Sequence, residues 1–273
     1  MEEMNRAMDE NGRDSHQTAV SLARTLAAAL PDDPRWLEPR AMLLTGHATI
    51  TGGESAADGF VVQLVHGARS AVAVVGRPPC ATIAAAVTGT TGLTPIVTQA
   101  ADAPHVAGCL EAAGQAGWTV ERAILHLLTA PAGRPAPAAD PDVRLLMRGD
   151  SLAHLPAGLR HEITHAQDFA PVAAVFVEGR PASFCYPVWT TEGFWDVSID
   201  TLEEHRGRSH AAHAVWFMID LMRERGREPV WGALASNAPS LRLGSKLGFT
   251  AVDEIAVVSR GGWVFLSGGF QDA

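Results

Sequence analysis

The chain has 273 residues, an apolar content of 47% and a net charge of −9 at pH 7. This length allows one large domain or two smaller ones, and the apolar content predicts a globular protein with a sizeable core. The acidic charge argues against nucleic acid or an anionic membrane as a partner. No apolar stretch is long enough to span a membrane, and the polar, acidic first residues do not resemble a signal peptide.

The cysteines are three in number and widely spaced, at Cys80, Cys109 and Cys185. Such a pattern does not predict a disulfide framework and is typical of a reducing compartment. We therefore expect a cytoplasmic protein without disulfide bonds.

The sequence of the N-terminal half predicts helices and strands in alternation. Residues 1–13 are polar and predicted to be flexible, and residues 14–130 are predicted to form an α/β domain. Apolar spacing predicts helices over residues 15–30, 79–88 and 105–116, and β-branched runs predict strands over 60–65, 70–75, 94–98 and 118–128. Residues 41–51 fit either a strand or a short helix.

A segment rich in Pro and Ala, residues 131–142, is predicted to be a linker to a second domain over residues 143–273. The sequence of the second domain predicts secondary-structure elements in the order β, α, hairpin, β, α, β, α, β, β. The predicted strands cover residues 143–147, 171–177, 182–189, 193–201, 229–234, 250–258 and 263–267, and the predicted helices cover 151–168, 211–222 and 238–247.

The segment TLEEHRGRSHAAHA, residues 201–214, connects a predicted strand to a predicted helix. The first N–H groups of a helix have no internal partner, and the helix dipole favours an anion there. Arg206 and Arg208 add positive charge to the turn, and Gly207 allows the backbone to approach a ligand closely. This pattern indicates a phosphate site, although an ordinary connection with two exposed arginines would read similarly.

A second motif, PVWGALASNAPSLRLGSKLGF at residues 229–249, combines a strand, an Asn at a helix start, a helix and an LGF exit. Together, RGRSHA and N-x-x-S-x-x-L-x-x-K-L-G-F resemble the GNAT superfamily of acetyl-CoA-dependent N-acyltransferases. The resemblance runs from about residue 142 to the C-terminus. It implies an α/β (α+β) fold with a mixed, mostly antiparallel twisted sheet flanked by helices. The order of elements suggests that the N-terminal half is a degenerate copy of this fold.

The resemblance also implies acetyl-CoA as the co-substrate, without a metal. It places the CoA pyrophosphate on the turn and the pantetheine arm along the strand at residues 193–201. The implied cofactor-binding residues are Ile199, Thr201, Arg206, Gly207, Arg208, Ser209, His210, Ala211, Asn237 and Ser240.

Two positions depart from the family pattern. Ser209 replaces the usual Gly, and it would be strained if the turn needs a positive φ there. Gly244 replaces a Tyr that often protonates the leaving thiolate, and the only tyrosine of the chain is Tyr186. A thiol with a pKa of about 8.5 is a tolerable leaving group, so this loss is compatible with activity.

An attacking amine must lose a proton, and Glu192 and Asp196 are the candidate bases or amine anchors. Strand alternation predicts that Asp196 and Asp200 face one side while Ile199 faces the other. A structural carboxylate is the simpler interpretation of either candidate taken alone.

A competing motif, HEITH at residues 161–165, places two histidines at i and i+4 around Glu162, as in zinc proteases. The third ligand would have to be Glu178 or Glu192, so an exposed amphipathic helix is the simpler interpretation.

The sequence therefore predicts an acyl-CoA-dependent N-acyltransferase that acetylates a small-molecule or peptide amine directly. A non-catalytic acyl-CoA-binding or regulatory protein is the alternative, and a zinc hydrolase is the third hypothesis. The expected partner is the amine acceptor rather than nucleic acid or a membrane, and an oligomer is compatible with the sequence.

Overall fold

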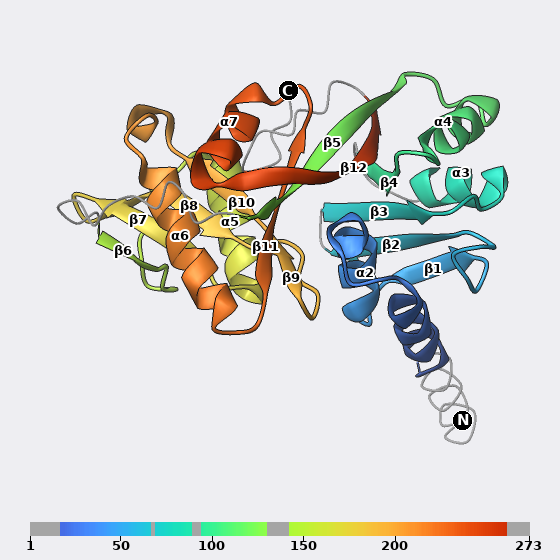
Figure 1. The fold of residues 1–273 in the computed structure, drawn as a ribbon, viewed down its shortest axis with the longest axis horizontal. Coiled ribbons are helices and arrows are strands. Elements are labelled where there is room, and N and C mark those ends of the chain that lie inside the picture. The colour runs from blue at the N-terminus through green and yellow to red at the C-terminus, as the bar shows by residue number, and fades with distance from the viewer. Residues whose placement is uncertain (1–16, 67–68, 89–93, 130–141, 261–273) are drawn as a thin grey trace, which may run out of the picture. The chain divides into compact units, whose positions relative to one another are not determined.

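The computed structural model describes residues 17–66, 69–88, 94–129 and 142–260. The chain divides into two compact units (Figure 1). Unit 1 contains residues 1–32, 38–120 and 256–261, and unit 2 contains residues 33–37, 121–255 and 262–273. The two units are described separately.

Unit 1 is built on a meander of β1 (Thr49–Gly52), β2 (Phe60–His66) and β3 (Arg69–Val75), followed by the parallel strand β4 (Ile96–Gln99). The crossover from β3 to β4 is made by α3 (Cys80–Thr88). Helix α4 (Ala103–Ala112) follows β4 and packs with α3 over a core of β-branched side chains. Ahead of the meander lie a helix over residues 17–29 and α2 (Leu37–Leu44).

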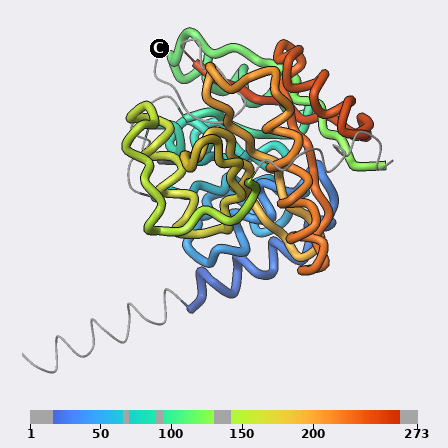
Figure 2. The backbone as a smooth tube through the Cα atoms, turned by 90° about the vertical axis from the view of Figure 1, so that its left-hand side faces the viewer, coloured from blue at the N-terminus to red at the C-terminus, as the bar shows by residue number. Residues whose placement is uncertain are grey.

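Unit 2 contains an antiparallel sheet in the order β10-β8-β7-β6, formed by β6 (Asp142–Leu145), β7 (Ala173–Val177), β8 (Arg180–Tyr186) and β10 (Ser198–Thr201). One face packs on α5 (Ala157–Phe169), and the other packs on α6 (His210–Arg223). The course of the chain can be followed in yellow and orange in Figure 2. Because both faces are covered, β7 and β8 are almost wholly apolar and buried.

Unit 2 continues with β11 (Glu228–Leu234), α7 (Ala238–Leu247) and β12 (Phe249–Arg260), and η1 (Pro34–Trp36) belongs to the same unit. Residues 121–128 of β5 (Trp118–Leu128) also lie in unit 2, where they pair with β11 in antiparallel fashion. The last residues of β12, from Ala256, lie in unit 1. Each unit is thus completed by strand residues from the other half of the chain.

The two halves of the chain repeat one order of elements: an antiparallel meander, a crossover helix, a parallel strand, a helix and a strand. The order is β1-β2-β3-α3-β4-α4-β5 in the first half. In the second half it is β7-β8-β9/β10-α6-β11-α7-β12, where β9 is Phe194–Asp196. The interpretation of the N-terminal half as a degenerate copy of the C-terminal fold depends on this repetition.

Three expectations need correction or extension. Residues 41–51 contain the end of α2 and the start of β1, so both predicted alternatives occur in succession. The predicted strand over residues 193–201 is two strands, β9 (Phe194–Asp196) and β10, with different partners. The expectation of no disulfide was wrong, since Cys80 and Cys109 are bonded. Residues 1–13, residues 131–141 of the predicted linker and the predicted strand at 263–267 lie outside the described residues, while residue 142 begins β6.

Candidate functional site

A strand that changes partners forms the centre of the candidate site. β9 pairs in parallel with the start of β11, and Val197 still donates its N–H to Val230 O at 2.9 Å. Beyond this point the chain continues as β10, which pairs with β8 instead and forms an edge of its sheet. β10 and β11 therefore diverge after the Val197–Val230 hydrogen bond.

The direction of the N–H groups along β10 follows from the hydrogen bonds at its two ends. Val197 N–H points to β11, whereas Leu202 N–H points to Ala182 O at 3.0 Å, on the β8 side. Because successive N–H groups of a strand alternate in direction, Ile199 and Thr201 direct theirs to the edge facing away from β8. These are the two residues of this strand that were predicted to bind a cofactor.

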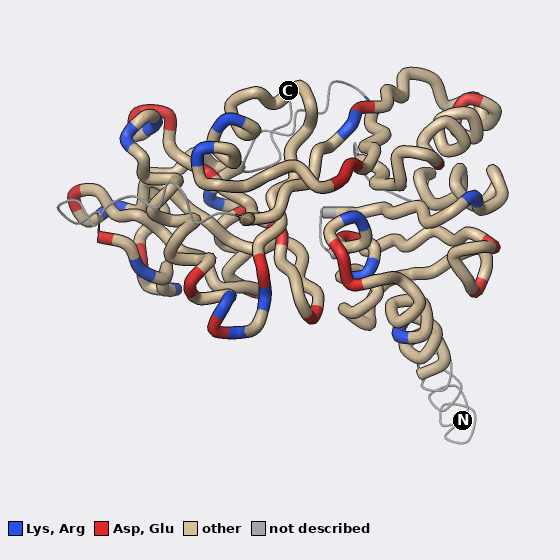
Figure 3. The backbone as a smooth tube through the Cα atoms, in the orientation of Figure 1, with Lys and Arg blue, Asp and Glu red and all other residues tan. Residues whose placement is uncertain are grey.

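The turn between β10 and α6 carries charges of both signs (Figure 3), with two acidic residues in η2 (Glu203–His205) and two arginines after it. Arg206 Nε donates to Thr201 O at 3.3 Å, which places a guanidinium beside the open end of β10. Gly207 has φ +74°, and Ser209, the residue before α6, has φ +64°. The expectation of a strained Ser209 is therefore confirmed, because a side chain in the left-handed region costs about 1–2 kcal/mol.

Imidazole groups surround the start of α6. His205 and His210 have ring centroids 6.1 Å apart. Their Nδ1 atoms are buried, and neither has a hydrogen-bond partner among the described residues. Burial is the main cause that lowers the pKa of His210, and electrostatic interactions with His205, His213 and Arg208 lower it further. An anion bound here would counteract this effect. Ala211, in the first turn of α6, is half-buried.

The start of α7 is held by its own side chains. Asn237 Oδ1 accepts the Ser240 N–H at 3.1 Å and caps the helix. Ser240 Oγ accepts the indole N–H of Trp231 at 3.2 Å and is buried. The structure thus gives the two residues predicted to contact the cofactor arm a role in positioning the helix start.

Gly244 lies against the same indole. A Cβ at this position would be 3.1 Å from Trp231 Nε1 and 3.2 Å from Cδ1 and Cε2. Trp231 is 1% exposed and also packs against Phe249, so it has little room to move. A side chain at position 244 would therefore have to displace the buried tryptophan ring of β11.

Asp196 ends β9, at the position where the chain leaves β11. Its Oδ1 accepts the N–H groups of both Val188 and Trp189, each at 2.7 Å. Burial of the carboxyl group outweighs these hydrogen bonds and raises its pKa to about 7. Such a carboxyl group can both accept and release a proton near neutral pH. The second candidate base, Glu192, is exposed in the turn that precedes β9.

A buried group that sequence reasoning did not find lies on the α5 face of the sheet. Tyr186 Oη is 2.8 Å from Glu162 Oε1 and 3.0 Å from Asp200 Oδ2, and all three residues are buried. A hydroxyl group has one proton, so two ionised carboxylates cannot both receive it. The alternation predicted for the strand is confirmed for Asp200 and Ile199, since Ile199 belongs to the core on the α6 side.

The hydrogen bond between Tyr186 and Glu162 also gives the acidic residue of the HEITH segment a place in the core. Glu162 points into the core toward Tyr186, while His161 is exposed. No group of three or more His, Cys, Asp or Glu residues suited to a metal ion occurs in the part of the chain that the structure describes.

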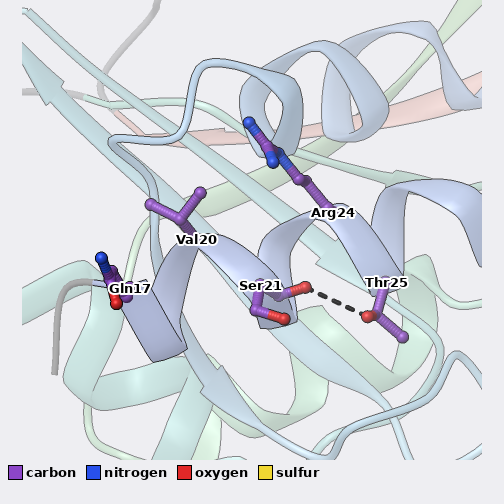
Figure 4. A pocket seen from close by; sticks show the side chains of 5 residues that line it. All are labelled: Gln17, Val20, Ser21, Arg24 and Thr25. Atoms are coloured by element: carbon purple, nitrogen blue, oxygen red, sulfur yellow. Dashed lines mark hydrogen bonds between the residues drawn. The ribbon is translucent and has the colours of Figure 1, made fainter. Parts of the chain in front are cut away.

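A separate pocket of about 460 Å³ lies on the helix of residues 17–29 in unit 1 (Figure 4). It is lined by Gln17, Val20, Ser21, Arg24 and Thr25, and none of the predicted site residues contributes to it. None of the helices in the described ranges is both long and apolar enough to cross a membrane.

Comparison with known proteins finds a family match within the C-terminal half of the chain. Residues 173–258 match the family model of GNAT acetyltransferase, which confirms the resemblance that the two motifs indicated. The match covers β7 to β12, including the diverging strands and both helix starts. No curated protein matches the sequence.

Solved structures show the same fold over most of the chain. A GCN5-related N-acetyltransferase-like protein from Streptococcus suis 89/1591 has a TM-score of 0.64 at 15% identity, covering 90% of this chain and 99% of the other. A putative GNAT acetyltransferase from Novosphingobium aromaticivorans has a TM-score of 0.58 at 19% identity, with coverage of 84% and 97%. A GCN5-related N-acetyltransferase from Kribbella flavida has a TM-score of 0.53 at 14% identity, with coverage of 84% and 94%. The mixed α/β fold predicted from the sequence is thereby confirmed.

Proposed function

We propose that the protein is an acyl-CoA-dependent N-acyltransferase that transfers acetyl from acetyl-CoA directly to an amine. The observation that carries this proposal is the divergence of β10 from β11, which directs the N–H groups of Ile199 and Thr201 to an open edge. An amide-rich pantetheine arm can add to such an edge as a strand would, through main-chain hydrogen bonds. The same N–H groups can stabilise negative charge that develops on the thioester oxygen.

The turn before α6 supplies the second half of the cofactor site. Arg206, Arg208 and the first N–H groups of α6 offer positive charge and donors to a pyrophosphate. The φ values of Gly207 and Ser209 bend the backbone into a concave turn of the kind that binds anions. Strain of this kind persists in proteins chiefly where the local conformation is needed.

Asp196 is the proposed acceptor for the proton of the amine. Acetyl-CoA supplies an activated acyl group, and the protein must orient the amine and remove its proton as the C–N bond forms. A carboxyl group with a pKa of about 7 is matched to this task. Two backbone N–H groups hold Oδ1 in place, and neither of these hydrogen bonds uses Oδ2. The leaving thiolate then takes a proton from solvent, since no side chain occupies the position of Gly244.

The alternative function is binding of acyl-CoA without transfer. It is favoured by one observation, the close contact of Gly244 with Trp231, which disfavours at this position the tyrosine that the family resemblance implies. The buried position of Glu162, in contrast, gives no support to the zinc hydrolase hypothesis.

The test is acetyl transfer from acetyl-CoA to a panel of cationic small-molecule amines and peptide N-termini, with acetylated product detected by mass spectrometry. We expect product with the wild type and a loss of at least about 100-fold in kcat/KM for Asp196→Asn, within the usual range for a general base. Asp168→Asn is the matched control, because it makes the same change at an exposed carboxylate of unit 2 that was not predicted to belong to the site. Binding of acetyl-CoA without product from any amine would favour the alternative function.

A further inference from the structure

We propose that Cys80 and Cys109 form a reversible thiol–disulfide site in unit 1, in which His105 assists Cys109. The two sulfurs are bonded and join α3 to α4 across a sequence separation of 29. Their surroundings differ in exposure, in position on a helix and in contact with a titratable group. These differences assign a separate role to each sulfur.

Cys80 is the sulfur that another molecule can reach. It is exposed and is the first residue of α3, where the helix dipole stabilises a thiolate. No acidic residue lies in the first turn of α3 to oppose that effect. Cys109, in contrast, is 2% exposed, so an incoming thiol meets Cys80 and displaces Cys109.

The imidazole of His105 lies against the buried sulfur. Its Nε2 and Nδ1 are 3.7 Å and 3.9 Å from Cys109 Sγ, and Nε2 is also 2.9 Å from Pro78 O. Because a carbonyl oxygen only accepts, Nε2 donates to Pro78, and Nδ1 is the ring nitrogen that can exchange a proton with Cys109. An imidazole within reach of a sulfur can serve as its acid or base.

The surroundings hold this arrangement together independently of the disulfide. Arg77 Nε donates to Asp102 Oδ1 at 3.0 Å, which ties the segment before α3 to the residue before α4. The Pro78–His105 hydrogen bond makes a second connection between the same elements. The two sulfurs are thus expected to stay close after reduction, so that the bond can form again.

The third cysteine, Cys185, does not take part in the proposed thiol–disulfide exchange. Cys185 lies in the core of unit 2, is fully buried, and has a pKa raised well above its usual value by burial. It therefore serves as an internal control for labelling of the other two.

The proposed reaction uses a low-molecular-weight disulfide, RSSR, as the oxidant. The Cys80 thiolate attacks one sulfur of RSSR and releases RS⁻, forming a mixed disulfide at Cys80. Cys109 passes its proton to His105 Nδ1 and attacks the Cys80 sulfur, which closes the protein disulfide and releases a second RS⁻. One RS⁻ takes the proton held by His105, and the other takes from solvent the equivalent of the proton that Cys80 lost on ionising. Two electrons thus pass from the protein dithiol to RSSR, giving two RSH, and reduction follows the same steps in reverse.

The test uses the full-length, folded protein in glutathione buffers of stepped GSH/GSSG ratio, followed by alkylation and mass spectrometry. We expect Cys80 and Cys109 to become labelled together as the GSH/GSSG ratio increases, while Cys185 stays unlabelled. The circular dichroism spectrum should stay that of the folded protein. A bridge that resists GSH until the protein unfolds would overturn the proposal, as would independent labelling of the two cysteines at every ratio.

The role of His105 is tested by the rate of reduction. His105→Ala is expected to slow reduction by GSH about ten-fold, because the leaving Cys109 thiolate loses its neighbouring imidazole. His47→Ala, which changes an exposed histidine of the same unit, should leave the rate unchanged. Equal rates for the wild type and His105→Ala would remove His105 from the site.

Discussion

Replacing Asp196 by Asn should make the protein more stable at pH 8 while leaving its stability at pH 4 nearly unchanged. The carboxyl group has a pKa of about 7 in the folded state, against 3.8 for the ordinary value, because burial disfavours its ionised form. Between these pH values the folded state holds more protons than the unfolded state, so the free energy of unfolding falls as the pH rises from about 4 to 7.

The size of the effect follows from the same values. A pKa that changes from 3.8 to about 7 corresponds to roughly 4 kcal/mol, at 1.36 kcal/mol per pKa unit. The wild type bears this full cost above pH 7, and Asp196→Asn does not, because an amide does not ionise. The amide oxygen can still accept the N–H groups of Val188 and Trp189, so the loop geometry should be retained.

The assay is urea unfolding of both proteins at pH 4, 6 and 8, followed by tryptophan fluorescence. The difference in the free energy of unfolding should be near zero at pH 4 and should favour the variant by up to about 4 kcal/mol at pH 8. Asp168→Asn is the control, because its exposed ion pair with Arg148 should contribute less than about 1 kcal/mol. A difference that does not depend on pH would refute the assignment of a raised pKa to Asp196.

Three further changes test the site. Gly244→Ala should destabilise unit 2 by about 1 kcal/mol in urea unfolding, because overpacking against Trp231 outweighs the gain in helix propensity; an equally stable variant would mean that the indole can move. Tyr186→Phe should cost about 1–3 kcal/mol near pH 7, since two buried carboxylates lose their shared hydroxyl, and an unchanged midpoint would contradict that arrangement. Ser209→Gly should stabilise the protein by about 0.5–1 kcal/mol, as the relief of strain exceeds the entropy cost of glycine, and a lower melting temperature would speak against strain.

The sequence was most informative where one residue has one local function. The turn between β10 and α6 could be predicted because Arg and Gly between a strand and a helix are typical of such a connection, and strain at Ser209 followed from replacing a glycine. Phosphate binding by this turn stays a prediction. The order of elements in unit 2 could be predicted because alternation and helical spacing are local properties. These predictions required no knowledge of contacts between distant residues.

Long-range contacts account for what the sequence did not reveal. The break between β9 and β10 depends on which neighbouring strand each residue bonds, and GFWDVSID alternates without interruption. The triad of Glu162, Tyr186 and Asp200 joins three elements, although a single tyrosine in a buried strand was a signal that it needed a partner. The Cys80–Cys109 bond was missed because its spacing follows no motif and depends on how α3 packs on α4.

The central claim is tested most directly by calorimetric titration of acetyl-CoA into the wild type and into Arg206→Ala/Arg208→Ala. We predict micromolar binding, about −8 kcal/mol, for the wild type and a loss of at least about ten-fold in the double variant. Arg148→Ala, which removes an exposed arginine elsewhere in unit 2, should bind as the wild type does. Absence of binding to the folded wild type, or equal binding by the double variant, would contradict the account of the turn before α6 as the acyl-CoA site.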